Sequence, residues 1–173
     1  MGWKLKTHMK FSTDTVQTSY QSPLGLMTLA ATDCALVGAW FADGRHVPDL
    51  SGCACASPDH PLLRLASEQL NAYFAGRRTR FELPLDLGSG TVFQTAVWQA
   101  LTHIEFGRTC TYGWVGSQIG KPLALRAVGA AIGRNPLSII VPCHRVIGAD
   151  GSLTGYAGGL VRKTALLQLE GAL

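Results

Sequence analysis

The stretch Ile139-Ile140-Val141-Pro142-Cys143-His144-Arg145-Val146-Ile147 decides how the rest of this chain is interpreted. Its β-branched residues are typical of a short buried strand, and a thiol lies beside an imidazole at its centre. A cysteine attacks as its thiolate and needs a base or cation close by. Neighbours on an extended chain point to opposite faces, so Cys143 and His144 could meet only through a local turn or a bridging water. Since a lone cysteine in such a run is more often a core residue, the stretch alone leaves both roles open.

The amino-acid composition limits the classes of protein to which this chain can belong. The 173 residues are 47% hydrophobic and 15% charged, which is typical of a globular chain that buries a core. No apolar run is long enough to span a bilayer, and the charged N-terminus lacks an apolar segment, so we expect neither a secretory signal nor membrane attachment. Five cysteines without framework spacing indicate free thiols in a reducing compartment, and we expect the cytoplasm.

Charge is unevenly distributed. Residues 1–90 hold eight Lys/Arg and eight Asp/Glu, whereas residues 91–173 hold seven and three, which accounts for the whole net charge of +4. The excess therefore lies in the half that contains Cys143. A basic half indicates a polyanionic partner, most commonly nucleic acid, although chance fluctuation over so few charges is the alternative.

The first half of the chain predicts a small sheet with one helix. Turn-forming Ser22-Pro23-Leu24-Gly25 precedes two apolar runs that we expect to pair as an antiparallel hairpin, residues 26–32 and 35–41. Helical spacing of apolar residues predicts an amphipathic helix over 61–75. The remaining segments are expected to be a frayed end or early edge strand (1–20), a surface loop (42–61) and a last strand (81–85).

The second half predicts short helices separated by glycine. Leu87-Gly88-Ser89-Gly90 is the candidate linker, and Thr91-x-x-Gln94 matches a capping box that opens a helix ending near Phe106-Gly107-Arg108. Thr111 can cap the next short helix, and a turn at Gly120-Lys121-Pro122 leads to a helix over about 122–133. Two short helices joined by a tight turn resemble a helix-turn-helix.

The helix over 122–133 has two distinct faces. Leu125, Val128 and Ile132 share an apolar face, and the other face carries Arg126, Gly129, Ala130 and Gly133. Small residues allow close backbone approach, so a single arginine among them could reach into a groove or a base stack. Tight helix–helix packing with Arg126 at its rim is the alternative.

Two features follow the Cys-His stretch. Gly155-Tyr156-Ala157-Gly158-Gly159 is too rich in glycine to be only a connection, and a final helix is expected from Leu160 to Glu170. Glu170 lies at the border of the apolar face of that helix. A glutamate at a helix end is usually solvated.

Together these motifs resemble the O6-alkylguanine-DNA alkyltransferases, also called methylated-DNA–protein-cysteine methyltransferases. The N-terminal part matches loosely, through Ser22-Pro23-Leu24-Gly25 and the hairpin. The stronger match covers Thr91 to Gly171, and its residues occur in family order. These residues are Tyr112, Arg126-Ala127-Val128-Gly129, Asn135-Pro136, Pro142-Cys143-His144-Arg145-Val146, Gly155-Tyr156-Ala157-Gly158-Gly159 and Leu166-Leu167-x-x-Glu170-Gly171.

The resemblance implies an α+β protein of two domains. Residues 1–88 would form a ribonuclease H-like domain, a small antiparallel sheet with a helix. Residues 91–173 would form a mainly helical, winged helix-turn-helix-like domain that carries the active cysteine. The family reaction moves an alkyl group from guanine O6 to that cysteine, which would be Cys143. Because the thioether has no good leaving group, each molecule would act once.

The family arrangement also implies roles for individual residues. His144 would take the thiol proton through a water, Glu170 would orient His144, and Asn135 would brace the turn before the active-site loop. Tyr112 would donate a hydrogen bond to the departing guanine.

The family arrangement further implies a pocket for a base flipped out of duplex DNA. Arg126 would fill the vacated stack while Ala127, Gly129 and Ala130 allow close approach. The pocket would be formed by Pro142, Val146, Tyr156, Ala157 and Gly158. The expected partner is double-stranded DNA carrying O6-alkylguanine, with O4-alkylthymine as a further substrate left open, and we expect a monomer.

Some residues depart from the family pattern. Trp114 stands where a glutamate usually completes a capping box, and Ala157 stands where some members have serine. We expect no cofactor and no metal, because Cys53-x-Cys55 with His46 and His60 lacks the usual ligand spacing. The alternatives are a non-enzymatic binder of alkylated DNA and a thiol hydrolase using Cys143, His144 and Glu170. Retention of Cys143 argues against the binder, since relatives that only bind replace it.

Overall fold

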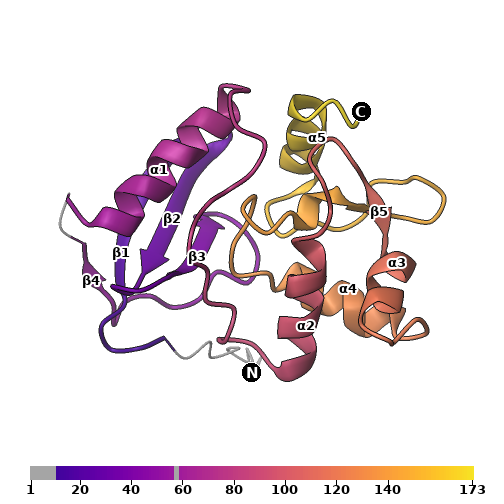
Figure 1. The fold of residues 1–173 in the computed structure, drawn as a ribbon, viewed down its shortest axis with the longest axis horizontal. Helices are drawn as coiled ribbons and strands as arrows, with labels where there is room; N and C mark the ends of the chain where they lie inside the picture. The colour runs from indigo at the N-terminus through magenta and orange to yellow at the C-terminus, as the bar shows by residue number, and fades with distance from the viewer. Residues whose placement is uncertain (1–10, 57–58) are drawn as a thin grey trace, which may run out of the picture.

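A computed structural model describes residues 11–56 and 59–173; the expectations for residues 1–10 lie outside this range. A four-stranded sheet forms the first layer, in the order β3-β2-β1-β4, and α1 (Pro61–Phe74) lies across it (Figure 1). β1 (Val16–Ser22) pairs antiparallel with β2 (Gly25–Ala31), which pairs antiparallel with β3 (Leu36–Phe41). The short β4 (Ala54–Cys55) pairs parallel with β1.

The second half is mainly helical. Its helices are α2 (Val92–Leu101), α3 (Tyr112–Gln118), α4 (Leu125–Gly133) and α5 (Leu160–Leu169), with one 3-10 turn, η1 (Cys143–Arg145). β5 (Cys110–Thr111) and β6 (Val146–Ile147) pair in parallel beside them. The capping box at Thr91 and Gln94 is present in full, and the Thr111 hydroxyl caps α3 through the amide of Trp114 at 3.2 Å. Thus α3 keeps its cap without the glutamate that Trp114 replaces.

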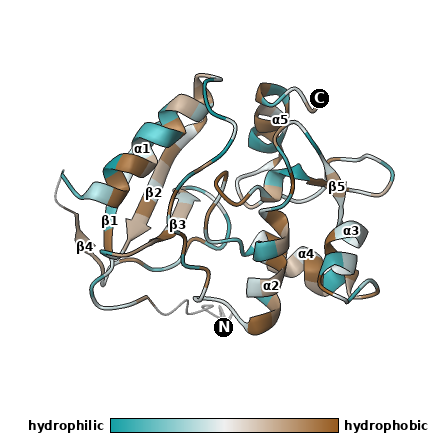
Figure 2. Ribbon diagram, in the orientation of Figure 1, coloured by the Kyte–Doolittle hydropathy of each residue, from teal (hydrophilic) through white to brown (hydrophobic). Residues whose placement is uncertain are grey.

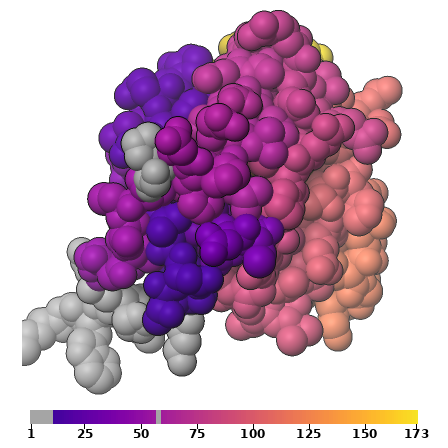
Figure 3. Space-filling view, turned by 60° about the vertical axis from the view of Figure 1, so that its left-hand side comes forward, coloured from indigo at the N-terminus to yellow at the C-terminus, as the bar shows by residue number. Residues whose placement is uncertain are grey.

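The apolar core continues from one half into the other. Buried side chains of the sheet and α1 join those of α2, α4 and the segment before Cys143 in a single cluster. Within it, fully buried Trp98 donates its indole N–H to the carbonyl of Ala131 at 2.8 Å, which fixes α2 against α4. Hydrophobic residues dominate β2 and β3, whereas β1 is largely polar and α1 carries both hydrophobic and hydrophilic residues (Figure 2). On the outside of the molecule, the atoms of the two halves adjoin without a gap in this view (Figure 3).

The hairpin, the helix over 61–75, both caps and the final helix are confirmed, and the chain is a two-domain α+β protein. Four expectations were wrong in detail. Residues 16–22 form an interior strand, and residues 81–85 make only one bridge, between Leu36 and Leu85. The first C-terminal helix ends at Leu101, and α4 begins at Leu125 rather than Pro122, which leaves Leu125 49% exposed.

The stretch around Cys143 is not a strand. Residues 138–140 form a turn, Val141 lies in a bend and Cys143–Arg145 form a 3-10 turn; within the stretch, only Val146 and Ile147 pair as a strand. β-branched residues favour a strand, but the burial of these residues comes from a turn packed into the core. Among residues 11–56 and 59–173, no helix is long and apolar enough to cross a bilayer.

Candidate active site

The turn between α4 and η1 is fixed against the edge of the sheet. Ala39 of β3 donates to the carbonyl of Pro136 at 2.8 Å and accepts from the amide of Ser138 at 2.9 Å. Within the turn, Ile139 has a φ of 74°, a left-handed conformation that a β-branched residue rarely adopts. The surrounding contacts must therefore hold this strained backbone in place.

Asn135 provides those contacts and also reaches the thiol. Its Nδ2 donates to the carbonyl of Val141 at 2.8 Å and to Cys143 Sγ at 3.0 Å, and its Oδ1 accepts from the amide of Leu137 at 3.0 Å. One buried amide thus closes the turn and fixes the position of the sulfur. This is the geometry expected for Asn135.

Cys143 is the first residue of η1, and 4% of its surface is exposed. Burial raises the pKa of the thiol, while the hydrogen bond from Asn135 and the charge of Lys163 act in the opposite direction. The thiol is therefore neutral at rest and needs a proton acceptor before it can attack.

His144 is fully buried, and its Nε2 lies 2.7 Å from Glu170 Oε1. Burial lowers the pKa of His144, against the opposing effect of Glu170, so the imidazole is neutral. Nε2 then carries the proton that Glu170 accepts, and Nδ1 keeps a free lone pair. Nδ1 is buried and has no hydrogen-bond partner in the described part of the chain. It is the atom available to accept a proton.

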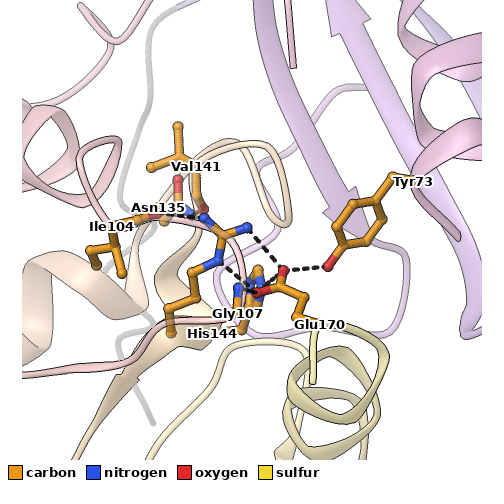
Figure 4. A network of polar contacts seen from close by, with 8 residues as sticks. Tyr73, Ile104, Gly107, Asn135, Val141, His144 and Glu170 are labelled. Atoms are coloured by element: carbon orange, nitrogen blue, oxygen red, sulfur yellow. Dashed lines mark hydrogen bonds and ion pairs between the residues drawn. The ribbon is translucent and has the colours of Figure 1, made fainter. Parts of the chain in front are cut away.

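Glu170 is the centre of the polar network (Figure 4). Besides His144, it accepts from Arg145 Nε at 2.8 Å and Nη2 at 3.0 Å, from the Tyr73 hydroxyl at 2.6 Å and from the Gly107 amide at 3.4 Å. Burial alone would raise the pKa of Glu170, but the hydrogen bonds from His144, Arg145 and Tyr73 outweigh it and bring the pKa to about 2. The buried carboxylate therefore stays charged and holds His144 in one orientation.

Tyr73 and the pairing of Arg145 with Glu170 were missed by sequence reasoning. Tyr73 belongs to α1 of the N-terminal half, 97 residues before Glu170, and was counted only as part of an apolar face. Its hydroxyl was the one available signal, because a fully buried tyrosine needs a hydrogen-bond partner. The sequence shows only that Arg145 follows Cys143 and His144, whereas in the structure its guanidinium is bound to the Glu170 carboxylate.

We expect Tyr73→Phe to destabilise the protein by about 1–3 kcal/mol, because a buried charged acceptor loses one of its donors. Urea unfolding at pH 7 measures the change. Phe74→Leu is the control, since the neighbouring side chain is partly buried and contacts no carboxylate. Equal stability of Tyr73→Phe and the wild type would show that this hydrogen bond contributes nothing.

A cavity of about 110 Å³ opens beside Cys143. Of the residues expected to form a pocket, Tyr156 and Ala157 line this cavity. The other lining residues are Arg45, His46, Tyr112, Gly129, Ile132, Gly133 and Gly155. The structure places Pro142, Val146 and Gly158 outside this lining. Pro142 borders a separate cavity beside Arg145, Val146 is fully buried in β6, and Gly158 packs against Tyr156 and Phe41.

The glycine-rich loop, residues 155–159, is anchored to α5 beside this cavity. Lys163 of α5 is fully buried and donates from Nζ to the carbonyls of Val146, Thr154 at 2.9 Å and Gly155 at 3.3 Å. From the opposite side, the Tyr112 hydroxyl donates to the carbonyl of Thr154 at 3.0 Å. To accept a hydrogen bond from the Tyr112 hydroxyl, a base entering the cavity would have to replace the Thr154 carbonyl as its acceptor.

α3 and α4 form the expected helix-turn-helix pair. On α4, Val128 and Ile132 are buried, whereas Arg126, Ala127 and Ala130 are exposed and Gly129 is half-buried against Tyr112. The Arg126 side chain makes no hydrogen bond or ion pair with any described residue. The small-residue face thus remains open next to the cavity.

Fold and site together define a two-domain protein with a buried cysteine, next to a histidine–glutamate pair, beside a helix-turn-helix. Family models agree: residues 15–87 match the ribonuclease-like domain of 6-O-methylguanine DNA methyltransferase, and residues 92–172 match its DNA-binding domain. The chain belongs to the 6-O-methylguanine DNA methyltransferase family. It is a DNA-repair enzyme that transfers an alkyl group from DNA to a cysteine of the protein.

Individual relatives support the assignment over most of the chain. A methylated-DNA–protein-cysteine methyltransferase of Mycolicibacterium paratuberculosis is 51% identical over 150 residues, which is 86% of this chain and 88% of the relative. One from Methanosarcina acetivorans is 47% identical and covers 88% and 96%. The crystal structure of Mycobacterium tuberculosis OGT in complex with DNA superposes with a TM-score of 0.82 at 47% identity, covering 89% of this chain and 91% of that one.

Proposed function

We propose that this chain repairs O6-alkylguanine in duplex DNA by moving the alkyl group irreversibly to Cys143. The observation that carries the proposal is that Cys143, which accepts a hydrogen bond from Asn135 and adjoins the His144–Glu170 pair in the chain, lines a cavity flanked by α4. The base would be flipped out of the stack to enter this cavity. We also propose that the protein acts as a monomer in a reducing cytoplasm, and that its domains are residues 1–88 and 91–173.

The proton of Cys143 moves first. His144 Nδ1 accepts it through a bridging water, since no hydrogen bond joins the two side chains in the described structure. The resulting imidazolium is stabilised by the charged Glu170, and the thiolate by the Asn135 amide. Cys143 and His144 are thus both neutral at rest, and they form a thiolate–imidazolium pair only when a substrate is present to react.

The alkyl transfer follows in line. A bond forms between Cys143 Sγ and the alkyl carbon while the bond from that carbon to guanine O6 breaks. The electron pair passes into the guanine ring, and Tyr112 donates a hydrogen bond to a ring nitrogen where the charge develops. The thioether on Cys143 has no good leaving group, so it is not hydrolysed and each molecule reacts once.

We expect Arg126→Ala to slow transfer from duplex DNA by about 10- to 100-fold, because an inserted side chain offsets the cost of unstacking the base. Transfer from the free base O6-methylguanine should fall much less, since a free base needs no flipping. Rates of Cys143 methylation on both substrates measure this, with Arg64→Ala on the exposed face of α1 as the control. Equal losses on both substrates would rule out a role in flipping.

A further inference from the structure

Two basic side chains of the N-terminal half line the cavity that holds Cys143. Arg45 and His46 follow β3, in a segment that the sequence suggested was only a surface loop, and both are exposed. Neither side chain makes a hydrogen bond or ion pair with any residue that the structure describes. The nearest carboxylate along the loop, Asp43, is paired with Arg162 at 2.9 Å. The Arg45 guanidinium and the His46 imidazole therefore face the cavity without an acidic partner among the described residues.

The loop is fixed in this position from both sides. The Arg45 amide donates to the carbonyl of Ala157 in the glycine-rich loop at 2.8 Å, and Arg162 joins Asp43 to the carbonyl of Gly158 at 3.0 Å. His46 has a φ of 59°, the left-handed conformation that few residues other than glycine adopt. This backbone conformation and the hydrogen bond of Arg45 to Ala157 keep the loop beside the cavity.

A second arginine lies close by. Arg134 follows the end of α4, and its Nε is buried without a hydrogen-bond partner among the described residues. Burial lowers the pKa of His46, and the charges of Arg134 and Arg45 lower it further, so the imidazole lies near both guanidinium groups and is itself uncharged at neutral pH. Like charges gathered without a counter-ion raise the free energy of the unbound protein and favour binding of an anion.

We infer that Arg45, with His46 and Arg134, forms an anion site at the mouth of the cavity that holds a phosphodiester of the damaged strand beside the extruded nucleotide. The inference rests on the proposed function, because a flipped nucleotide brings its own phosphates to the mouth of the pocket. Arginine contacts to phosphate fix the register of a protein on DNA without reading sequence. The N-terminal domain thereby takes part in holding the substrate, opposite the face of α4.

The test compares Arg45→Ala and Arg45→Glu with the wild type on O6-methylguanine in duplex DNA and as the free base. We expect the second-order rate constant on the duplex to fall about 10-fold for alanine and further for glutamate, with a much smaller loss on the free base. The slope of log affinity against log salt should fall by about one for alanine. Arg64→Ala is the matched control, and thermal unfolding confirms that each variant folds.

A binding measurement separates this inference from the proposed chemistry. In a Cys143→Ser background, which cannot form the thioether, Arg45→Ala should still weaken binding to the lesion duplex. Wild-type affinity for both Arg45 variants at low salt would overturn the anion site, whether or not Cys143 is the acceptor. Equal losses on the duplex and the free base would also overturn it, because Arg45 would then shape the pocket instead of holding phosphate.

Discussion

Cys143→Ser is expected to abolish alkyl transfer, by about 10³-fold or more, because a serine hydroxyl is far less acidic and less nucleophilic than a thiol. The fold should survive, since the two side chains differ little in volume and the serine oxygen can still accept the hydrogen bond from Asn135. Methyl transfer from an O6-methylguanine duplex, followed by mass spectrometry of the protein, measures the effect. DNA binding should be retained.

Cys110→Ser is the matched control. Cys110 is a half-buried thiol in β5 whose pKa burial raises to about 11, so it is a poor nucleophile at neutral pH. Its replacement should leave transfer to Cys143 intact. Methylation of the protein in the Cys143→Ser variant would instead place the acceptor at another residue.

Glu170→Gln is expected to destabilise the protein by about 3–5 kcal/mol, because the Arg145 guanidinium remains buried without its counter-charge. Transfer should also slow by at least about 100-fold, since an amide cannot stabilise the imidazolium of His144 or fix its tautomer equally well. Urea unfolding and single-turnover rates measure the two effects separately. Glu68→Gln, on the exposed surface of α1, should change neither by much.

The pH dependence of stability provides a further check on Glu170. Its pKa in the folded protein, about 2, lies below the ordinary value of 4.5. The ionised group therefore stabilises the fold above about pH 4.5, and that contribution, about 3 kcal/mol, is lost as the pH falls toward 2. The difference in unfolding free energy between wild type and Glu170→Gln should shrink over this range. A constant difference from pH 7 to pH 3 would mean that Glu170 is not held ionised by its neighbours.

Much of the fold followed from local sequence signals. The hairpin, the amphipathic helix α1 and the helix caps at Thr91 and Thr111 depend on residues a few positions apart, and the sequence predicted them correctly. The segment before Cys143 was misread because β-branched residues are buried in strands and turns alike. Only the tertiary contacts of Asn135 and Ala39 show that Ile139 adopts a left-handed turn.

The site was predictable where a family motif covers it and not where the two halves meet. Cys143, His144 and Glu170 came from the motif, and the structure adds which imidazole nitrogen is free. Tyr73 and Arg45 could not be found this way, because each reaches the site across the interface from a segment without a distinctive pattern. Their chemistry becomes visible only once α1 and the loop after β3 are placed against the C-terminal half.

The most direct test of the central claim is the stoichiometry of transfer. The purified protein is incubated with excess duplex DNA carrying one O6-methylguanine, and intact mass and peptide mapping follow the product. We predict that each protein molecule gains one methyl group, located on Cys143, and that the reaction then stops with guanine restored in the DNA. Continued turnover, or a methyl group on any other residue, would contradict the account.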